Sequence, residues 1–155
     1  MQLCRRHPGL CGTVLDLPLV CEIGMEHVLP EPEHPRITFI KADIRRDPVP
    51  GGYDLIAFKS MLHDWPDEDA AHFIAKASQS LNPGGTLLIF ERGPIHVGKA
   101  APPFSMLPTL LFFRSYRPPS LYMGQLEALG FREVVCREIE LDTPFFLVTA
   151  RKPAA

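Results

Sequence analysis

The sequence predicts an α/β protein built on a mostly parallel sheet, with helices on both faces and an antiparallel hairpin at the C-terminal end. Short apolar runs alternate with helical segments along most of the 155 residues, as in strands joined by right-handed crossovers. The run Thr86–Phe90 is apolar throughout, as in a strand that helices cover on both faces. The last two strand-like runs have no helix between them, which favours an antiparallel pair at one edge.

The N-terminal third is expected to contain one helix end followed by alternating strands and helices. Residues 1–7 have the pattern of a helix that Pro8 and Gly9 stop. Pro18 suits the first turn of the next helix, because its missing N–H would have no helical partner there. The expected elements are a strand over 13–17, a helix over 18–28, and strands over 36–42 and 53–58.

Residues 67–81 form the clearest helix in the sequence. Their apolar side chains recur at spacings of three and four and so lie on one face; they are Ala70, Phe73, Ile74, Ala77 and Leu81. Three acidic residues, 67–69, occupy the first turn, where the helix dipole favours negative charge. The turn-forming residues 82–85 are expected to end the helix.

The C-terminal half continues the same alternation and then departs from it. Gly130 is expected to close the last helix. The predicted elements are a strand over 86–90, helices over 104–113 and 120–129, and a hairpin of strands over 133–138 and 145–151.

Composition excludes several classes of protein. A net charge of −2 and the absence of a basic cluster argue against nucleic-acid binding. No apolar run is long enough to cross a membrane, and the first residues lack the apolar stretch of a signal peptide, so we expect a cytoplasmic protein with reduced cysteines. Cys4, His7 and Cys11 do not have the spacing of a zinc site, so no metal is expected.

Three carboxylates stand at the carboxyl ends of predicted strands. They are Asp16, Asp43 and Glu91. Ligands of open α/β sheets bind beyond the carboxyl ends of the strands, and carboxylates there can accept hydrogen bonds from ribose hydroxyls or from an adenine amino group. A single such residue can equally be a helix N-cap. Three together favour a nucleotide-like ligand.

One stretch resembles a known family. Lys59, followed by His63-Asp64-Trp65 and then Asp67-Glu68, is similar to the signature of the plant-type O-methyltransferases, a group that includes caffeate and hydroxyindole methyltransferases and many bacterial enzymes. Further matches occur in the same order, over roughly residues 1–150; they are Val14–Pro18, Ala42–Ile44, Asn82–Gly85 and Leu88–Glu91. The resemblance implies a Rossmann-like methyltransferase sheet and S-adenosylmethionine as the cofactor.

The resemblance also implies roles for individual residues. Asp16 and Leu17 would contact the ribose of the cofactor, Asp43 and Ile44 would contact the adenine, and Lys59 would line the same site. His63 would be the general base for a small hydroxylated acceptor, with Glu91 holding its imidazole. Asp64, Met106 and Leu110 are predicted to contact the acceptor, although the last two belong to an apolar stripe that could equally be core.

Histidine suits the chemistry of methyl transfer to a hydroxyl. A phenol has a pKa near 10 and a histidine near 6.5, so complete proton transfer before attack would cost about 3.5 pKa units, or about 5 kcal/mol. A nearby carboxylate fixes the tautomer of a histidine and increases its basicity. Proton transfer that accompanies the attack avoids most of the cost.

The sequence departs from the family pattern in two places. Tyr116-Arg117 stands where the family has a Glu-Arg pair, so the second acid beside the catalytic histidine is replaced by a tyrosine. The resemblance further implies that residues 1–155 are a partial methyltransferase domain, without the first strand, the glycine-rich loop and the N-terminal dimerisation domain of the family.

The missing strand would lie between the strands over 13–17 and 53–58 and would leave two apolar edges, which invite pairing with another chain. We therefore expect a homo-oligomer or a partner chain that completes the sheet. The alternative to a working enzyme is an inactive remnant, or one half of a split methyltransferase.

Overall fold

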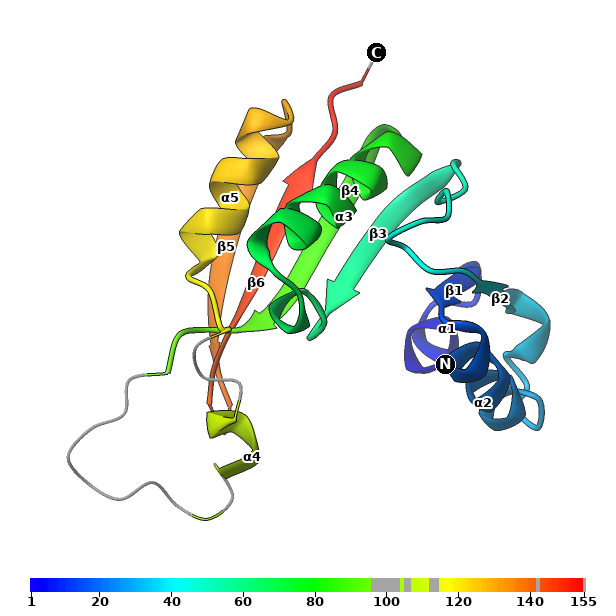
Figure 1. Cartoon of the computed structure of the whole chain (residues 1–155). Helices are drawn as coiled ribbons and strands as arrows, with labels where there is room; N and C mark the ends of the chain where they lie inside the picture. Colours follow the sequence, from blue (N-terminus) through cyan, green and yellow to red (C-terminus); the bar gives the residue numbers. More distant parts are fainter. Residues whose placement is uncertain (96–103, 105–106, 112–114, 142, 155) are drawn as a thin grey trace. The chain divides into compact units, whose positions relative to one another are not determined.

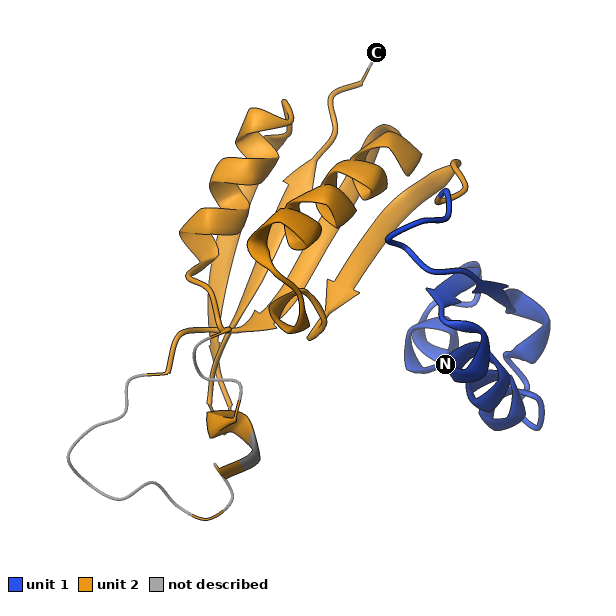
Figure 2. Ribbon diagram, in the orientation of Figure 1, with its two compact units in different colours: residues 1–48 blue, residues 49–155 orange. Residues whose placement is uncertain are grey.

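The computed structural model describes residues 1–95, 104, 107–111, 115–141 and 143–154. The chain forms two compact units, Met1–Pro48 and Val49–Ala155, which Figure 2 shows in different colours. Each unit contains its own sheet, and each is considered by itself below.

The first unit is a small β-α-β arrangement. Its elements are α1 (Gln2–Arg6), β1 (Gly12–Asp16), α2 (Pro18–Val28), the 3-10 turn η1 (His34–Arg36) and β2 (Ile37–Lys41). The two strands pair in parallel, from Gly12 opposite Ile37 to Asp16 opposite Lys41. The predicted helix over 18–28 is confirmed with the same bounds, and the predicted helix end over 1–7 is confirmed as α1.

Arginine side chains hold the loops of this unit together. The guanidinium of Arg36 donates hydrogen bonds to the carbonyl oxygens of Cys4, His7 and Leu10, which fixes the end of α1 against η1. Arg5 forms ion pairs with Glu31 and Glu33. These contacts matter because the buried apolar core of the unit is small; it consists of Cys4, Cys21, Val28 and Ala42.

The second unit contains the larger sheet. Its elements are β3 (Tyr53–Lys59), the 3-10 turn η2 (Leu62–Asp64), α3 (Asp67–Ser80), β4 (Leu81–Arg92), α4 (Leu107–Leu110), α5 (Pro119–Ala128), β5 (Arg132–Glu140) and β6 (Pro144–Arg151). The strand order is β3-β4-β6-β5, with β3 and β4 parallel and the other two pairs antiparallel. The predicted C-terminal hairpin is therefore confirmed.

The core of the second unit lies between the sheet and the helices α3 and α5, which cover the same face of the sheet (Figure 1). Alternate residues of β4 point into it, because side chains two apart on a strand share a face. The predicted apolar stripe of α3 is confirmed as buried. The core residues include Ala70, Phe73, Ile74, Ala77, Leu87, Ile89, Tyr122, Leu126, Phe146 and Val148.

A lysine near the C-terminus of the chain caps the C-terminal end of α3. The Nζ of Lys152 donates hydrogen bonds to the carbonyl oxygens of Ser78 and Leu81, each at 2.7 Å. A cation at this end also opposes the negative end of the helix dipole. The strand β4 starts directly after the helix, at Leu81, which pairs with Tyr53.

The predicted mixed α/β architecture is confirmed, and the strands predicted over 13–17 and 53–58 belong to different sheets. The described strands form two sheets, because β1 pairs only with β2 and β3 pairs only with β4 and with no strand of the first unit. Within the second unit, α3 and α5 lie on one face (Figure 1). Of the helix predicted over 104–113, the described part is helical over Leu107–Leu110. Met106 lies outside the described residues.

The buried face of β4 gives a stability prediction. Ile89 is fully buried, whereas Leu55 on β3 is 51% exposed. Removing three methylene-sized groups from a filled core leaves a cavity, so Ile89→Ala is expected to lower the free energy of unfolding by about 2–5 kcal/mol. Leu55→Ala is the matched control and is expected to change it by about 1 kcal/mol or less. Trp65, the single tryptophan, lies in this unit, so its fluorescence during urea unfolding is the measurement. Equal effects of the two substitutions would contradict this description of the core.

Candidate active site

The candidate site is built where the chain leaves β3. Ser60 has a φ of 49°, in the left-handed region that non-glycine residues rarely adopt, and its N–H donates to the carbonyl oxygen of Phe90 at 2.8 Å. This turns the backbone away from the sheet. The next residues form η2, which carries His63.

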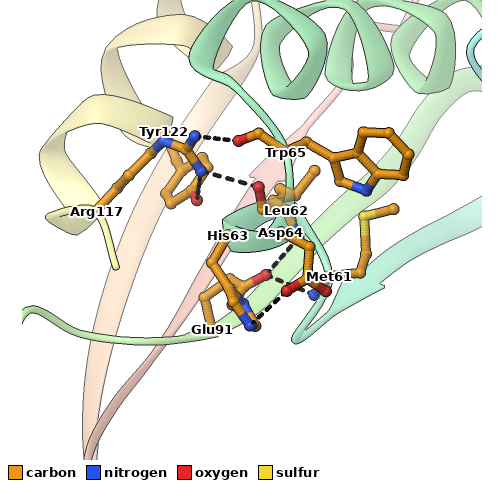
Figure 3. A network of polar contacts seen from close by, with 8 residues as sticks. All are labelled: Met61, Leu62, His63, Asp64, Trp65, Glu91, Arg117 and Tyr122. Atoms are coloured by element: carbon orange, nitrogen blue, oxygen red, sulfur yellow. Dashed lines mark hydrogen bonds and ion pairs between the residues drawn. The ribbon is translucent and has the colours of Figure 1, made fainter. Parts of the chain in front are cut away.

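Glu91 organises this turn from the end of the neighbouring strand β4. Its side chain is 1% exposed. Oε1 accepts hydrogen bonds from the backbone N–H groups of Met61 and Leu62, both at 2.8 Å. Oε2 lies 2.7 Å from Nδ1 of His63 (Figure 3). A buried carboxylate is tolerated only when it is fully paired, and these three contacts provide the pairing.

The contact with Glu91 determines which nitrogen of His63 can act as a base. A carboxylate accepts hydrogen bonds, so it favours the tautomer with the proton on Nδ1 and leaves the lone pair on Nε2. Nε2 lies 3.3 Å from Oδ1 of Asp64, whose side chain is 49% exposed. The imidazole itself is 8% exposed. A proton taken up on Nε2 would therefore be stabilised by a second carboxylate.

Tyr116 packs against the imidazole. The ring centroids of Tyr116 and His63 are 5.0 Å apart, with an angle of 56° between the planes. Burial raises the pKa of the Tyr116 hydroxyl, and the carboxylates of Asp64 and Glu91 add to this effect against the opposing charge of Arg92. Tyr116 is therefore a neutral aromatic neighbour of His63.

Arg117 holds the other side of the same turn. Its guanidinium donates to the carbonyl oxygen of Leu62 at 2.9 Å and to that of Trp65, and it forms an ion pair with Asp67 in the first turn of α3. Its NH1 also lies 3.5 Å from the hydroxyl of Tyr122 (Figure 3). Sequence reasoning assigned no role to Arg117. The available signal was its position beside Tyr116, in the pair that aligns with the family's Glu-Arg.

Four of the five predicted cofactor residues lie together in the first unit. Asp16 ends β1 and its Oδ1 accepts the N–H of Leu17 at 2.8 Å. The N–H of Ala42 donates to the carbonyl oxygen of Asp16, so the residues after β2, Asp43 and Ile44, follow directly beside the end of β1. Parallel pairing explains this arrangement, since both strands end at the same edge.

The carboxylate of Asp43 is held by its own loop. It accepts hydrogen bonds from the backbone N–H of Arg45 and from the Arg45 guanidinium, and it forms an ion pair with that side chain at 2.7 Å. The side-chain hydrogen bonds from Arg45 lower the pKa of Asp43 to about 2, against an opposing effect of desolvation. Asp43 is therefore ionised throughout the physiological range.

The remaining predicted residues lie in the second unit. Lys59 ends β3 opposite Phe90, the residue that precedes Glu91 in β4. Asp64 contacts His63 as described above, and Leu110 is a half-buried residue of α4. Met106 is not among the described residues.

The described part of the chain has neither a metal-binding cluster nor a membrane-spanning helix. No group of three or more His, Cys, Asp or Glu side chains there is arranged to hold a metal ion, and the four cysteines are free thiols. Among these residues, none of the helices has both the length and the apolar character needed to cross a bilayer.

Comparison with known proteins identifies the family. Residues 1–111 match the O-methyltransferase domain family. The 3-hydroxy-5-methyl-1-naphthoate 3-O-methyltransferase of Streptomyces sahachiroi is 40% identical over 91 residues, which cover 59% of this chain and 26% of that protein. The S-adenosylmethionine-dependent methyltransferase SibL, solved in its apo form, matches with a TM-score of 0.79 and 26% identity over 98% of this chain and 46% of that one. Human N-acetylserotonin methyltransferase, solved in complex with SAM, matches with a TM-score of 0.72 and 25% identity over 97% of this chain and 43% of that one.

The chain thus spans about a quarter of the length of the Streptomyces relative and under half of the solved ones. Its mixed α/β fold is that of these methyltransferases. The family match covers more than half of the 155 residues and includes the His63 turn and Glu91. On this basis, the chain belongs to the O-methyltransferase domain family.

Proposed function

We propose that the chain is part of an S-adenosylmethionine-dependent O-methyltransferase that acts on a hydroxyl of a small aromatic molecule, with His63 as the general base. The observation that carries the proposal is the buried His63–Glu91 pair, in which Nδ1 and Oε2 are 2.7 Å apart, in a chain of this family. The names of relatives support the substrate class, since the Streptomyces enzyme is named for methylation of a hydroxynaphthoate.

The site can remove the acceptor proton as methylation proceeds. S-adenosylmethionine would supply an electrophilic methyl group, and its sulfonium sulfur would become a neutral thioether when this methyl group is transferred. His63 accepts the hydroxyl proton on Nε2 while the oxygen attacks, and Glu91 keeps the other nitrogen protonated. Asp64, 3.3 Å from Nε2, stabilises the resulting imidazolium and contacts the acceptor. Tyr116 supplies an aromatic neighbour in place of a second acid.

The first unit supplies the proposed nucleotide contacts. Asp16 binds the ribose hydroxyls through Oδ2, because Oδ1 is occupied by the N–H of Leu17. Asp43 and Ile44 contact the adenine. The Asp43 carboxylate fits this role as an ionised acceptor, and Arg45 holds it in place from one side. Lys59 lines the cofactor site, and Leu110 contributes to the acceptor site.

We further propose that strands from a second copy of the chain, or from a partner chain, complete the two sheets. In the described residues, β1 bonds only to β2 and β3 only to β4, so each has one edge without a strand. Apolar side chains near these edges are accessible, with Val14 39% exposed and Leu55 51% exposed. Unpaired edges of this kind favour pairing with another strand. Residues 1–155 would then be a partial domain that acts only in the completed assembly.

The role of His63 is tested by turnover in the completed enzyme, that is, the assembly in which a second copy or a partner chain completes the two sheets. His63→Ala is expected to lower kcat by about 10²–10⁴-fold, the usual contribution of a general base. Glu91→Gln is expected to lie between this variant and the parent, because the base remains but its orientation is less fixed. His72→Ala, at an exposed position of α3, is the control and should retain activity. Methyl transfer to a panel of hydroxylated aromatics, followed by the release of S-adenosylhomocysteine, is the measurement. Near-parental turnover of His63→Ala would refute the assignment.

Cofactor binding is tested separately with S-adenosylhomocysteine. We expect residues 1–155 alone to bind it with a dissociation constant above the low micromolar range. These residues contain no Gly-x-Gly turn that would let the backbone approach the cofactor closely. Asp16→Ala should weaken this affinity further, by about 1–3 kcal/mol, since the ribose hydroxyls lose their acceptor. His63→Ala should leave it unchanged. Chemical-shift titration measures such weak constants, and tight binding by the isolated chain or an unaltered affinity in Asp16→Ala would contradict the proposal.

The state of association tests the proposal on the sheet edges. We expect residues 1–155 to form a dimer or larger species, because strand pairing satisfies the open edges of β1 and β3. Size-exclusion chromatography with light scattering, over a range of concentrations, is the measurement. A stable monomer at high concentration that unfolds cooperatively would count against this expectation.

A further inference from the structure

The side chain of Arg117 contacts both ends of the turn that carries His63. It lies just before α5, and its side chain is 10% exposed. The guanidinium donates to the carbonyl oxygen of Leu62 at the start of η2 and to that of Trp65 directly after it. The same group pairs with Asp67, so it also attaches the turn to the first residue of α3.

The turn is thus held by two oppositely charged side chains. Glu91 accepts the N–H groups of Met61 and Leu62, whereas Arg117 donates to the carbonyl oxygens of Leu62 and Trp65. Leu62 is fixed on both its N–H and its C=O, and His63 is the next residue. Because these bonds involve charged partners in a largely buried place, they are stronger than neutral hydrogen bonds.

We propose that Arg117 is a positioning residue for His63. By fixing the backbone on both sides of the histidine, it keeps the imidazole within hydrogen-bond distance of Glu91 and against Tyr116, its own neighbour in sequence. Without the guanidinium, the carbonyl oxygens of Leu62 and Trp65 lose the charged donor that joins them, and the turn can rotate. Nδ1 then separates from Oε2, and the proton is no longer confined to Nδ1.

This inference rests on the proposed function only for its catalytic consequence. The orientation of the His63 ring is a property of the chain itself and can be measured without turnover. The geometry assigns Arg117 an effect on the tautomer of His63, which a side chain that only stabilises the fold would not have.

Lys152 provides a matched control for this distinction. Like Arg117, it is a cationic side chain that donates to two backbone carbonyl oxygens at an end of α3, those of Ser78 and Leu81. It acts at the C-terminal end of the helix, whereas Arg117 acts at the N-terminal end. Lys152→Gln therefore removes the same kind of contact from the same unit without touching the His63 turn.

The experiment is nitrogen NMR of the histidine rings in residues 1–155, with the signal of His63 assigned by its absence in His63→Ala. In the parent chain we expect the Nδ1-protonated tautomer to predominate. Arg117→Gln should mix the two tautomers of His63. Arg117→Lys, which keeps the charge but not the forked geometry, should retain part of the parent behaviour. Lys152→Gln should leave the His63 signals unchanged while lowering the thermal midpoint to a similar extent.

Two results would overturn the proposal. One is an unchanged tautomer of His63 in Arg117→Gln, and the other is a mixture of the two tautomers in Lys152→Gln. If Arg117→Gln does not fold, Arg117→Lys and Asp67→Asn make the same comparison with smaller perturbations. In the completed enzyme, Arg117→Gln should lower kcat more than it raises KM for the acceptor. A loss of turnover in His63→Ala with unchanged His63 signals in the Arg117 variants would reject the positioning role and retain the proposed function.

Discussion

The buried carboxylate of Glu91 is the contact on which the rest of the candidate site depends. With 1% exposure it would be costly without partners, and it is stable here because two backbone amides and the imidazole of His63 all donate to it. The same three contacts attach the turn after β3 to the end of β4. A single charged group thus fixes a loop, orients a histidine and connects two neighbouring strands.

A second charge complements it from the opposite direction. Arg117 donates to backbone carbonyls of the turn that Glu91 holds by its amides, and it also pairs with Asp67 at the start of α3. Tyr116 packs against the imidazole of His63, with the ring centroids 5.0 Å apart. The site therefore combines one buried carboxylate, one exposed carboxylate and one neutral aromatic ring around the histidine. Glu91 and Arg117 hold the backbone of the turn that carries this histidine.

The first unit shows the same dependence on short-range polar contacts. Its apolar core is small, so arginine side chains and parallel strand pairing fix the loops that follow β1 and β2. Arg45 orients Asp43 and keeps it ionised, while Asp16 is anchored through the N–H of the next residue. These loops carry the residues proposed to bind the nucleotide, so their rigidity bears directly on recognition.

The sequence alone determined the features that depend on local spacing. The bounds of α2, the apolar stripe of α3 and the C-terminal hairpin follow from periodicity and turn residues, and the resemblance in the His63 turn and at Glu91 pointed to the family that the comparisons show. Only the tertiary structure decided how Arg117 is used, because its contacts with Leu62 and Asp67 join residues 55 and 50 positions apart. It also decided that Lys152 closes the end of α3, because its contacts with Ser78 and Leu81 join residues 74 and 71 positions apart. Local patterns record which face of a helix or strand is buried, but a polar side chain chooses its partner only when folding brings distant segments together.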